Sequence, residues 1–193
     1  MKSFYLTILS LALAGLAVSI TVDEKNLLLR LHNAARTRIL NCSVPGQPPA
    51  RSMQMLKWHD GLSKKAQQWS DRCITGHDKN DDRKLPEFWW VGQNFAGFPS
   101  VEPGFNAWFD EYKQYNFMAN TCSGVCGHYT QLVWADTEYV GCGVTKCTKP
   151  SFPYGYSIVC NYGLGGNMNG ARPYTAGTLG DCRKTSKSLL YFY

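Results

Sequence analysis

The chain has 193 residues, long enough for one domain with a sizeable core, and its formal net charge is +6 at pH 7. The basic residues are scattered along the sequence and no nucleic-acid-binding motif accompanies them, which argues against nucleic acid as a partner. After the first 20 residues no apolar run approaches the length of a transmembrane helix, so we do not expect an integral membrane protein.

The first 19 residues are typical of a secretory signal peptide. Met1-Lys2 is a short basic start, residues 4–18 are apolar except for Thr7 and Ser10, and Ala17-Val18-Ser19 supplies small residues for a cleavage site. We therefore predict a secreted, extracellular protein in which residues 1–19 are the signal peptide, 20–170 form the domain and 171–193 are a basic C-terminal extension.

All eight cysteines follow that segment, and an even number in a secreted chain indicates disulfides rather than catalytic thiols. A zinc site that combines Cys122-x3-Cys126 with Cys142-x4-Cys147 is a weaker alternative in an oxidising compartment. Asn41-Cys42-Ser43 makes Asn41 a candidate glycosylation site, although a bridged Cys42 would make it a poor acceptor.

Helical patterns dominate the first part of the domain. Thr21-Val22-Asp23-Glu24 has the form of a capping box, and apolar residues then recur at helical spacing over residues 22–40. Asp60 can cap a second helix with Leu62, Ala66, Trp69 and Cys73 on one face, and Ser100 can start a third. Short strands are predicted over residues 53–58 and 92–96, and a charged loop over 78–86.

The clearest strand patterns come last. Residues 139–144 and 156–162 are rich in β-branched and aromatic residues, and the turn over residues 150–155 predicts that they pair antiparallel. Because the helices precede these strands, the order of elements indicates an α+β or layered sandwich domain.

Residues 127–134 place an imidazole, a hydroxyl and an amide next to a short apolar run. Taken alone, a histidine such as His128 before an apolar run is more often a structural residue than a metal ligand or a general base. Other segments have to decide between these interpretations.

Four segments together carry a family resemblance. Residues 127–137 (Gly-His-Tyr-Thr-Gln-Leu-Val-Trp-Ala-Asp-Thr) fit one signature at every position, and residues 160–168 fit a second except at Leu164 and, upstream, at Ser157. Leu31-His32-Asn33 with Arg36, and residues 69–73 with His77, resemble the first two helices of the same family. This is the CAP superfamily of cysteine-rich secretory proteins, antigen 5 and pathogenesis-related 1 proteins, and the chain looks most like the secreted venom allergen-like proteins of parasitic worms.

The resemblance implies an α+β fold, a three-layer α-β-α sandwich with a central, mainly antiparallel sheet. It implies disulfides between Cys73 and Cys147, Cys122 and Cys126, and Cys142 and Cys160. The remaining pair, Cys42 and Cys182, could tie the first loop to the tail.

The resemblance also implies a cleft with two histidines and two glutamates. The matching positions are His77, His128 and Glu111, whereas the second glutamate is replaced by Gln93. Because the glutamine side chain cannot act as an acid or a base, the division of acid and base roles between two carboxylates is lost. We therefore expect no enzymatic activity and no required cofactor, and we name His77 and His128 as a candidate weak site for zinc or another divalent cation.

Two apolar sites are implied as well. Phe88-x-Trp90-x4-Phe95-x2-Phe98 has the aromatic spacing of a caveolin-binding motif, and the resemblance then implies a sterol site. The spacing of these four aromatic residues, taken alone, favours positions in the hydrophobic core instead. A fatty acid site between the first and third helices would be lined by seven residues, unless the two helices pack directly: Leu27, Leu28, Leu31, Phe105, Trp108, Phe109 and Tyr112.

The function expected from these features is lipid binding by a secreted, non-enzymatic protein, with sterols and fatty acids as ligands and lipid transport or host interaction as its role. One alternative is an immunomodulatory protein-interaction module that acts on a host or partner receptor. A metal-assisted hydrolase is a third reading, weakened by Gln93 and by the lack of a Gly-x-Ser-x-Gly motif.

Overall fold

The computed structural model describes residues 19–182, so nearly all of the predicted signal peptide and the last residues of the predicted extension lie outside the described residues. The helices and strands follow in the order α1 (Val22–Leu40), β1 (Lys57–Trp58), α2 (Asp60–Ser70), α3 (Asn80–Arg83), β2 (Gly92–Phe98), α4 (Val101–Asp110), η1 (Glu111–Gln114), β3 (Tyr115–Asn116), β4 (Thr121–Cys122), α5 (Gly127–Leu132), β5 (Tyr139–Lys146), β6 (Tyr156–Gly163) and η2 (Leu179–Asp181). The class is α+β, as predicted.

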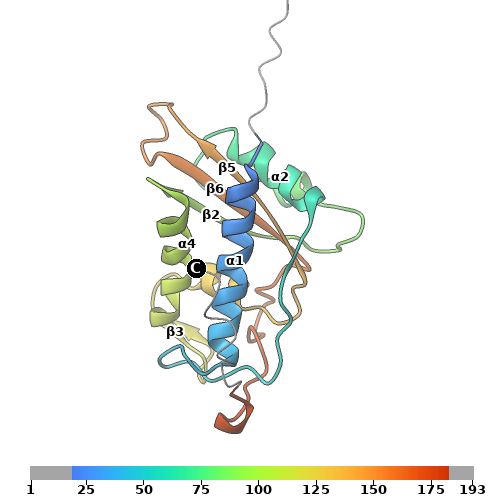
Figure 1. Ribbon diagram of the computed structural model, residues 1–193, viewed down its shortest axis with the longest axis vertical. Helices are drawn as coiled ribbons and strands as arrows, with labels where there is room; N and C mark the ends of the chain where they lie inside the picture. Colours follow the sequence, from blue (N-terminus) through green and yellow to red (C-terminus); the bar gives the residue numbers. More distant parts are fainter. Residues whose placement is uncertain (1–18, 183–193) are drawn as a thin grey trace, which may run out of the picture.

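The central sheet has the strand order β1-β5-β6-β2. Strands β5 and β6 pair antiparallel, as the sequence predicted, and β2 adds antiparallel to the other edge of β6. Only the two-residue strand β1 is parallel to its neighbour β5, so the sheet is mainly antiparallel. Strand β2 forms one edge and lies next to α4 (Figure 1).

Helices cover both faces of this sheet, which gives the three layers (Figure 1). On one face α2 lies against β5, and a Cβ atom on Gly141 or Gly143 would lie within 2.2–2.3 Å of the α2 backbone at Ser63 or Gln67. Glycine is therefore required for this close approach. On the other face α1, α4 and α5 surround the main core, to which β5 contributes the buried side chains of Val140, Cys142 and Val144.

The caps of the first two helices differ from each other. Thr21 and Glu24 form the predicted capping box at the start of α1. Helix α2 begins differently from the prediction, because His59 Nδ1 accepts from the Leu62 amide at 3.2 Å and Asp60 is the first helical residue. The helix ends at Ser70, before Cys73, whose φ of +51° cannot continue a right-handed helix.

The eight cysteines form four disulfides: Cys42–Cys182, Cys73–Cys147, Cys122–Cys126 and Cys142–Cys160. The last three are the pairs that the resemblance implied, and the first joins the two cysteines that remained. Cys42–Cys182 and a β-bridge between Ala50 and Ala176 attach residues 171–182 to the body of the domain. Within residues 19–182, no helix combines the length and the apolar sequence needed to cross a bilayer.

Candidate functional site

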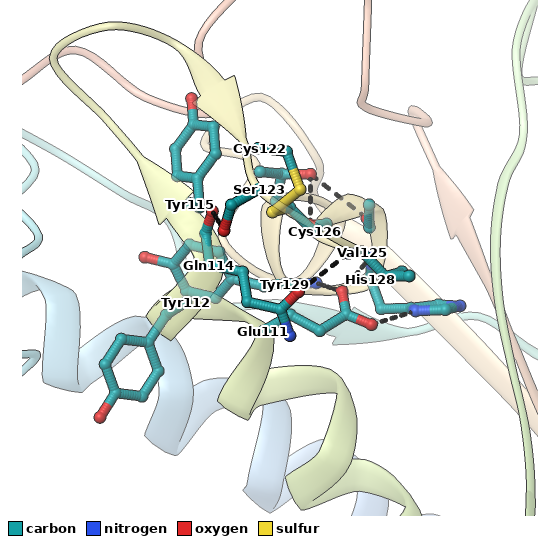
Figure 2. The surroundings of a disulfide bond; sticks show 12 residues. Glu111, Tyr112, Gln114, Tyr115, Cys122, Ser123, Val125, Cys126, His128 and Tyr129 are labelled. Atoms are coloured by element: carbon teal, nitrogen blue, oxygen red, sulfur yellow. Dashed lines mark hydrogen bonds and ion pairs between the residues drawn. A yellow bond between two sulfur atoms is a disulfide. The ribbon is translucent and has the colours of Figure 1, made fainter.

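One side of the candidate cleft is built by Glu111 and the first turn of α5. The Glu111 carboxylate accepts from the backbone amides of His128 and Tyr129 at 3.0 and 3.1 Å, and its other oxygen accepts from His128 Nδ1 at 2.5 Å. Figure 2 shows this carboxylate facing the start of α5, with the imidazole of His128 held beside it. Glu111 thus supplies the free amides of a helix start with an acceptor and at the same time fixes the His128 ring.

The segment before α5 is held in place by Gln114 and a disulfide. Cys122–Cys126 closes a short loop, while the Gln114 carbonyl and side chain accept from the amides of Ser123 and Val125 at 3.0 and 3.1 Å (Figure 2). Because η1 carries both Glu111 and Gln114, one short helix positions the carboxylate and the loop that leads into α5.

The opposite side of the cleft is built around Gln93 of β2. Its side-chain oxygen accepts from His77 Nδ1 at 2.9 Å, and its amide nitrogen donates to Asp78 at 3.1 Å and to Asn161 at 2.9 Å. Asp78 in turn forms an ion pair with Arg83, and the side chains of both are at least 92% buried. A second, buried carboxylate therefore lies one hydrogen bond behind the amide of Gln93, at the position where the resemblance implied a glutamate.

This arrangement explains why an amide fits at position 93. Two of its neighbours, the carboxylate of Asp78 and the side-chain oxygen of Asn161, are acceptors and need donors. Glutamine supplies both hydrogens and still accepts from His77. A glutamate there would instead place its negative charge about 3 Å from a buried carboxylate.

We expect Gln93→Glu to lower the free energy of unfolding by about 2 kcal/mol near neutral pH. Two carboxylates that share a site raise one pKa, so the folded variant keeps a proton that the unfolded chain has lost. The deficit should therefore be small near about pH 5 and grow toward about pH 8. Urea unfolding at both pH values measures it.

The matched control is the double variant Asp78→Asn with Gln93→Glu, which exchanges the donor and acceptor sides of the pair. It should recover most of the stability at the higher pH. Equal stability of the parent and Gln93→Glu at both pH values would show that the Asp78–Gln93 contact contributes nothing.

His77 and His128 lie close enough together to act on one ligand. Their ring centroids are 6.5 Å apart, and each ring is held through Nδ1, by Gln93 and Glu111 respectively. This leaves both Nε2 atoms as the atoms that can bind. Two imidazole nitrogens oriented by polar partners fit a zinc ion that completes its shell with water.

The four aromatic residues predicted to bind sterol do not share one environment. Phe88 packs against His59 and Tyr139, with ring centroids 5.3 and 5.9 Å away, and Trp90 donates to the Gly166 carbonyl at 3.3 Å. Phe95 and Phe98 instead line a cavity between β2 and α4. The sterol assignment stays a prediction, now with two separate pairs of residues.

Four of the seven residues predicted to line a fatty acid channel belong to the main core, and the other three, Leu27, Leu31 and Tyr112, are partly buried and pack against it. Leu28, Phe105, Trp108 and Phe109 are at most 4% exposed. In this structure the helix faces pack together, so an acyl chain would have to separate them.

Some residues in and near the site were not predicted from the sequence. Asp78 and Arg83 fall in the segment that was predicted as a charged loop, and in the structure Arg83 closes the short helix α3. Trp89, which lies between Phe88 and Trp90, is 71% exposed. The run of three aromatic residues directly after the charged loop was the available signal for it.

Comparisons with known proteins bear on the family and the fold. The family model described as the cysteine-rich secretory protein family (CAP) matches residues 29–162. GLIPR1-like protein 1 of Bos taurus is 38% identical over 157 residues, and the match covers 78% of this chain and 62% of that protein. Venom allergen 5 of Dolichovespula arenaria is 39% identical over 165 residues, and the match covers 77% of this chain and 78% of that protein. The chain thus spans about three fifths of the length of the mammalian relative.

Solved structures show the same fold. Schistosoma mansoni venom allergen-like protein 4 superposes with a TM-score of 0.77 at 38% identity, covering 84% of this chain and all of that one. NaASP2, solved with Zn²⁺, has a TM-score of 0.66 at 24% identity and covers 82% of this chain and 88% of that one. At that identity the second likeness concerns the fold alone.

Proposed function

This chain belongs to the cysteine-rich secretory protein (CAP) family, and on that premise we propose that it is a secreted, extracellular protein that binds sterols and fatty acids and carries them as cargo. The four disulfides that take up all eight cysteines support the extracellular assignment, because such bonds persist in oxidising compartments.

The surface aromatic segment Phe88–Trp90 is the observation that carries the sterol assignment. Trp89 is 71% exposed, and the rings on both sides of it are half-buried. The exposed ring of Trp89 and the exposed parts of its two neighbours form an apolar surface that a ligand can cover. A flat sterol ring system complements the faces of such aromatic side chains.

We expect Phe88→Ala with Trp90→Ala to abolish saturable binding of radiolabelled cholesterol by the delipidated protein, while palmitate binding is unchanged. Trp89→Ala, which removes an exposed ring without opening the core, should weaken cholesterol binding by about tenfold. Circular dichroism checks that each variant is folded.

Leu27→Asp in α1 is the matched control for the aromatic variants. It puts a charge at a half-buried position that packs against the main core, where the charge should weaken binding of an acyl chain and leave cholesterol binding intact. Cholesterol binding that is unaffected by all the aromatic variants would refute the sterol site, and a parent protein that binds neither lipid would refute the proposed function.

We also propose that His77 and His128 would hold a zinc ion or another divalent cation through their Nε2 atoms. The donor set supports this, since both rings are oriented from behind by Gln93 and Glu111. A bound cation would supply electrostatic stabilisation of a negatively charged group in the cleft. With two protein ligands, binding should be weak.

A further inference from the structure

A cavity of about 290 Å³ lies between the edge strand β2 and helix α4. Its walls are mostly apolar, and they include Phe95 and Phe98 of β2, Trp108 of α4, and Tyr154 from the turn before β6. Glu111 and His128 line the cavity near the C-terminus of α4, and Thr75 adds a hydroxyl to its lining. We call this space the β2–α4 cavity.

Most polar atoms along its walls already have partners. The Trp108 indole N–H donates to the Phe95 carbonyl at 2.9 Å, which also closes the edge of β2 to an added strand. Asn94 donates to the His128 carbonyl at 3.1 Å. An occupant of this cavity therefore meets apolar walls along most of its length.

The polar end beside α4 offers the imidazole of His128 as a specific contact. Glu111 accepts from two backbone amides and from His128 Nδ1, so its oxygens are engaged. The His128 ring stacks on Trp108, with centroids 6.0 Å apart and an angle of 21° between the planes. One face of the imidazole and its Nδ1 are thus occupied. Nε2 is the atom left to bind a ligand, and it can pair with a hydroxyl only when it does not hold a divalent cation.

The chemistry of this end selects the head group. A hydroxyl can both donate and accept, so it pairs with Nε2 in either protonation state of the ring, whereas a carboxylate can only accept. A carboxylate would also bring a second negative charge next to Glu111. The end of the cavity therefore favours a neutral alcohol over a fatty acid anion.

The size of the cavity limits the apolar part of the ligand. One water occupies about 30 Å³ of liquid, so a volume of 290 Å³ accommodates on the order of ten methylene-sized groups. We propose that the β2–α4 cavity binds a neutral alcohol with a medium-length apolar body, whose hydroxyl pairs with His128 Nε2 and whose body lies against Phe95, Phe98 and Trp108. The inference rests on the proposed lipid-binding function. It gives Phe95 and Phe98, which the sequence assigned to sterol binding, a site apart from Phe88 and Trp90 and with its own head-group preference.

The test compares 1-decanol with decanoate by isothermal titration calorimetry on the delipidated full-length protein near neutral pH. We expect saturable decanol binding, with decanoate weaker by about tenfold or more. Ala107→Phe, which fills the cavity from α4, should abolish decanol binding. Its matched control is Asn106→Phe, the same substitution at an exposed neighbouring position, which should bind like the parent.

His128→Phe tests the head-group contact, because phenylalanine keeps a ring that can stack on Trp108 and removes Nε2, together with the Nδ1 contact to Glu111. Decanol should bind about tenfold more weakly to it. Decanol binding unchanged by Ala107→Phe, or decanoate binding as tightly as decanol, would overturn this inference while cholesterol and palmitate binding still supported the proposed function. A parent protein that binds none of the four ligands would overturn both.

Discussion

Replacing Arg36 with methionine should lower the free energy of unfolding by about 4 kcal/mol, the largest single-residue effect we expect in the core. Arg36 is fully buried, and its guanidinium donates to four backbone carbonyls: those of Leu132 at 3.0 Å, Gln54 at 2.7 Å, Thr137 at 3.0 Å and Trp134 at 2.6 Å. Burial lowers the pKa of Arg36 to about 10, so the side chain is still charged at neutral pH. Methionine has a similar stem but leaves these carbonyls buried without donors.

The consequence reaches the cleft, because one of these carbonyls belongs to Leu132, the last residue of the helix α5 that carries His128, and another to Trp134, just beyond it. Chemical unfolding in urea at neutral pH measures the loss. Arg30→Met, on an exposed face of the same helix, is the matched control and should change stability by less than about 0.5 kcal/mol. A similar small change for both variants would mean that water or rearranged backbone groups replace the guanidinium.

The parts of the fold that the sequence predicted are those fixed by local patterns. The capping box at Thr21 and the helical spacing after it define α1, and the β-branched and aromatic runs define β5 and β6. Helix α5 was missed because it has only six residues and its start is held by Glu111 from another element. No local propensity marks a helix of that kind.

The cleft shows the same division. Motif positions placed His77, Gln93, Glu111 and His128 in one site, and the structure brings them together. Asp78 could not be found in this way, because a buried carboxylate and a solvated one look alike in a charged segment. Its role depends on α3 placing Arg83 beside it and on β2 presenting Gln93, which are tertiary contacts. In three dimensions, Gln93 connects the buried carboxylate of Asp78 to the imidazole of His77.

Lowering the pH from 6.5 to 4 should destabilise the protein by about 3 kcal/mol through His32 alone. This side chain is fully buried between α1, α4 and the sheet: Nδ1 donates to the Leu28 carbonyl at 2.6 Å, Nε2 accepts from the Tyr162 hydroxyl at 2.9 Å, and the Phe105 ring lies 4.9 Å away. Burial lowers the pKa of His32 from 6.5 to about 4, and the charge of nearby Arg36 acts in the same direction. Between these pH values the unfolded chain binds a proton that the native protein does not, so stability falls as the pH falls.

His32→Gln removes the titrating group, so its stability should change less with pH over this range than that of the parent, even if the variant is less stable at pH 7. The measurement is the free energy of unfolding in urea at several pH values from about 4 to about 7. Asn33→Ala is the matched control: it loses side-chain hydrogen bonds to Leu56 but keeps His32, so it should be destabilised and retain the parent's pH dependence. If the parent and His32→Gln change equally with pH, the acid sensitivity of this fold must come from its carboxylates, and His32 must be able to accept a proton without unfolding.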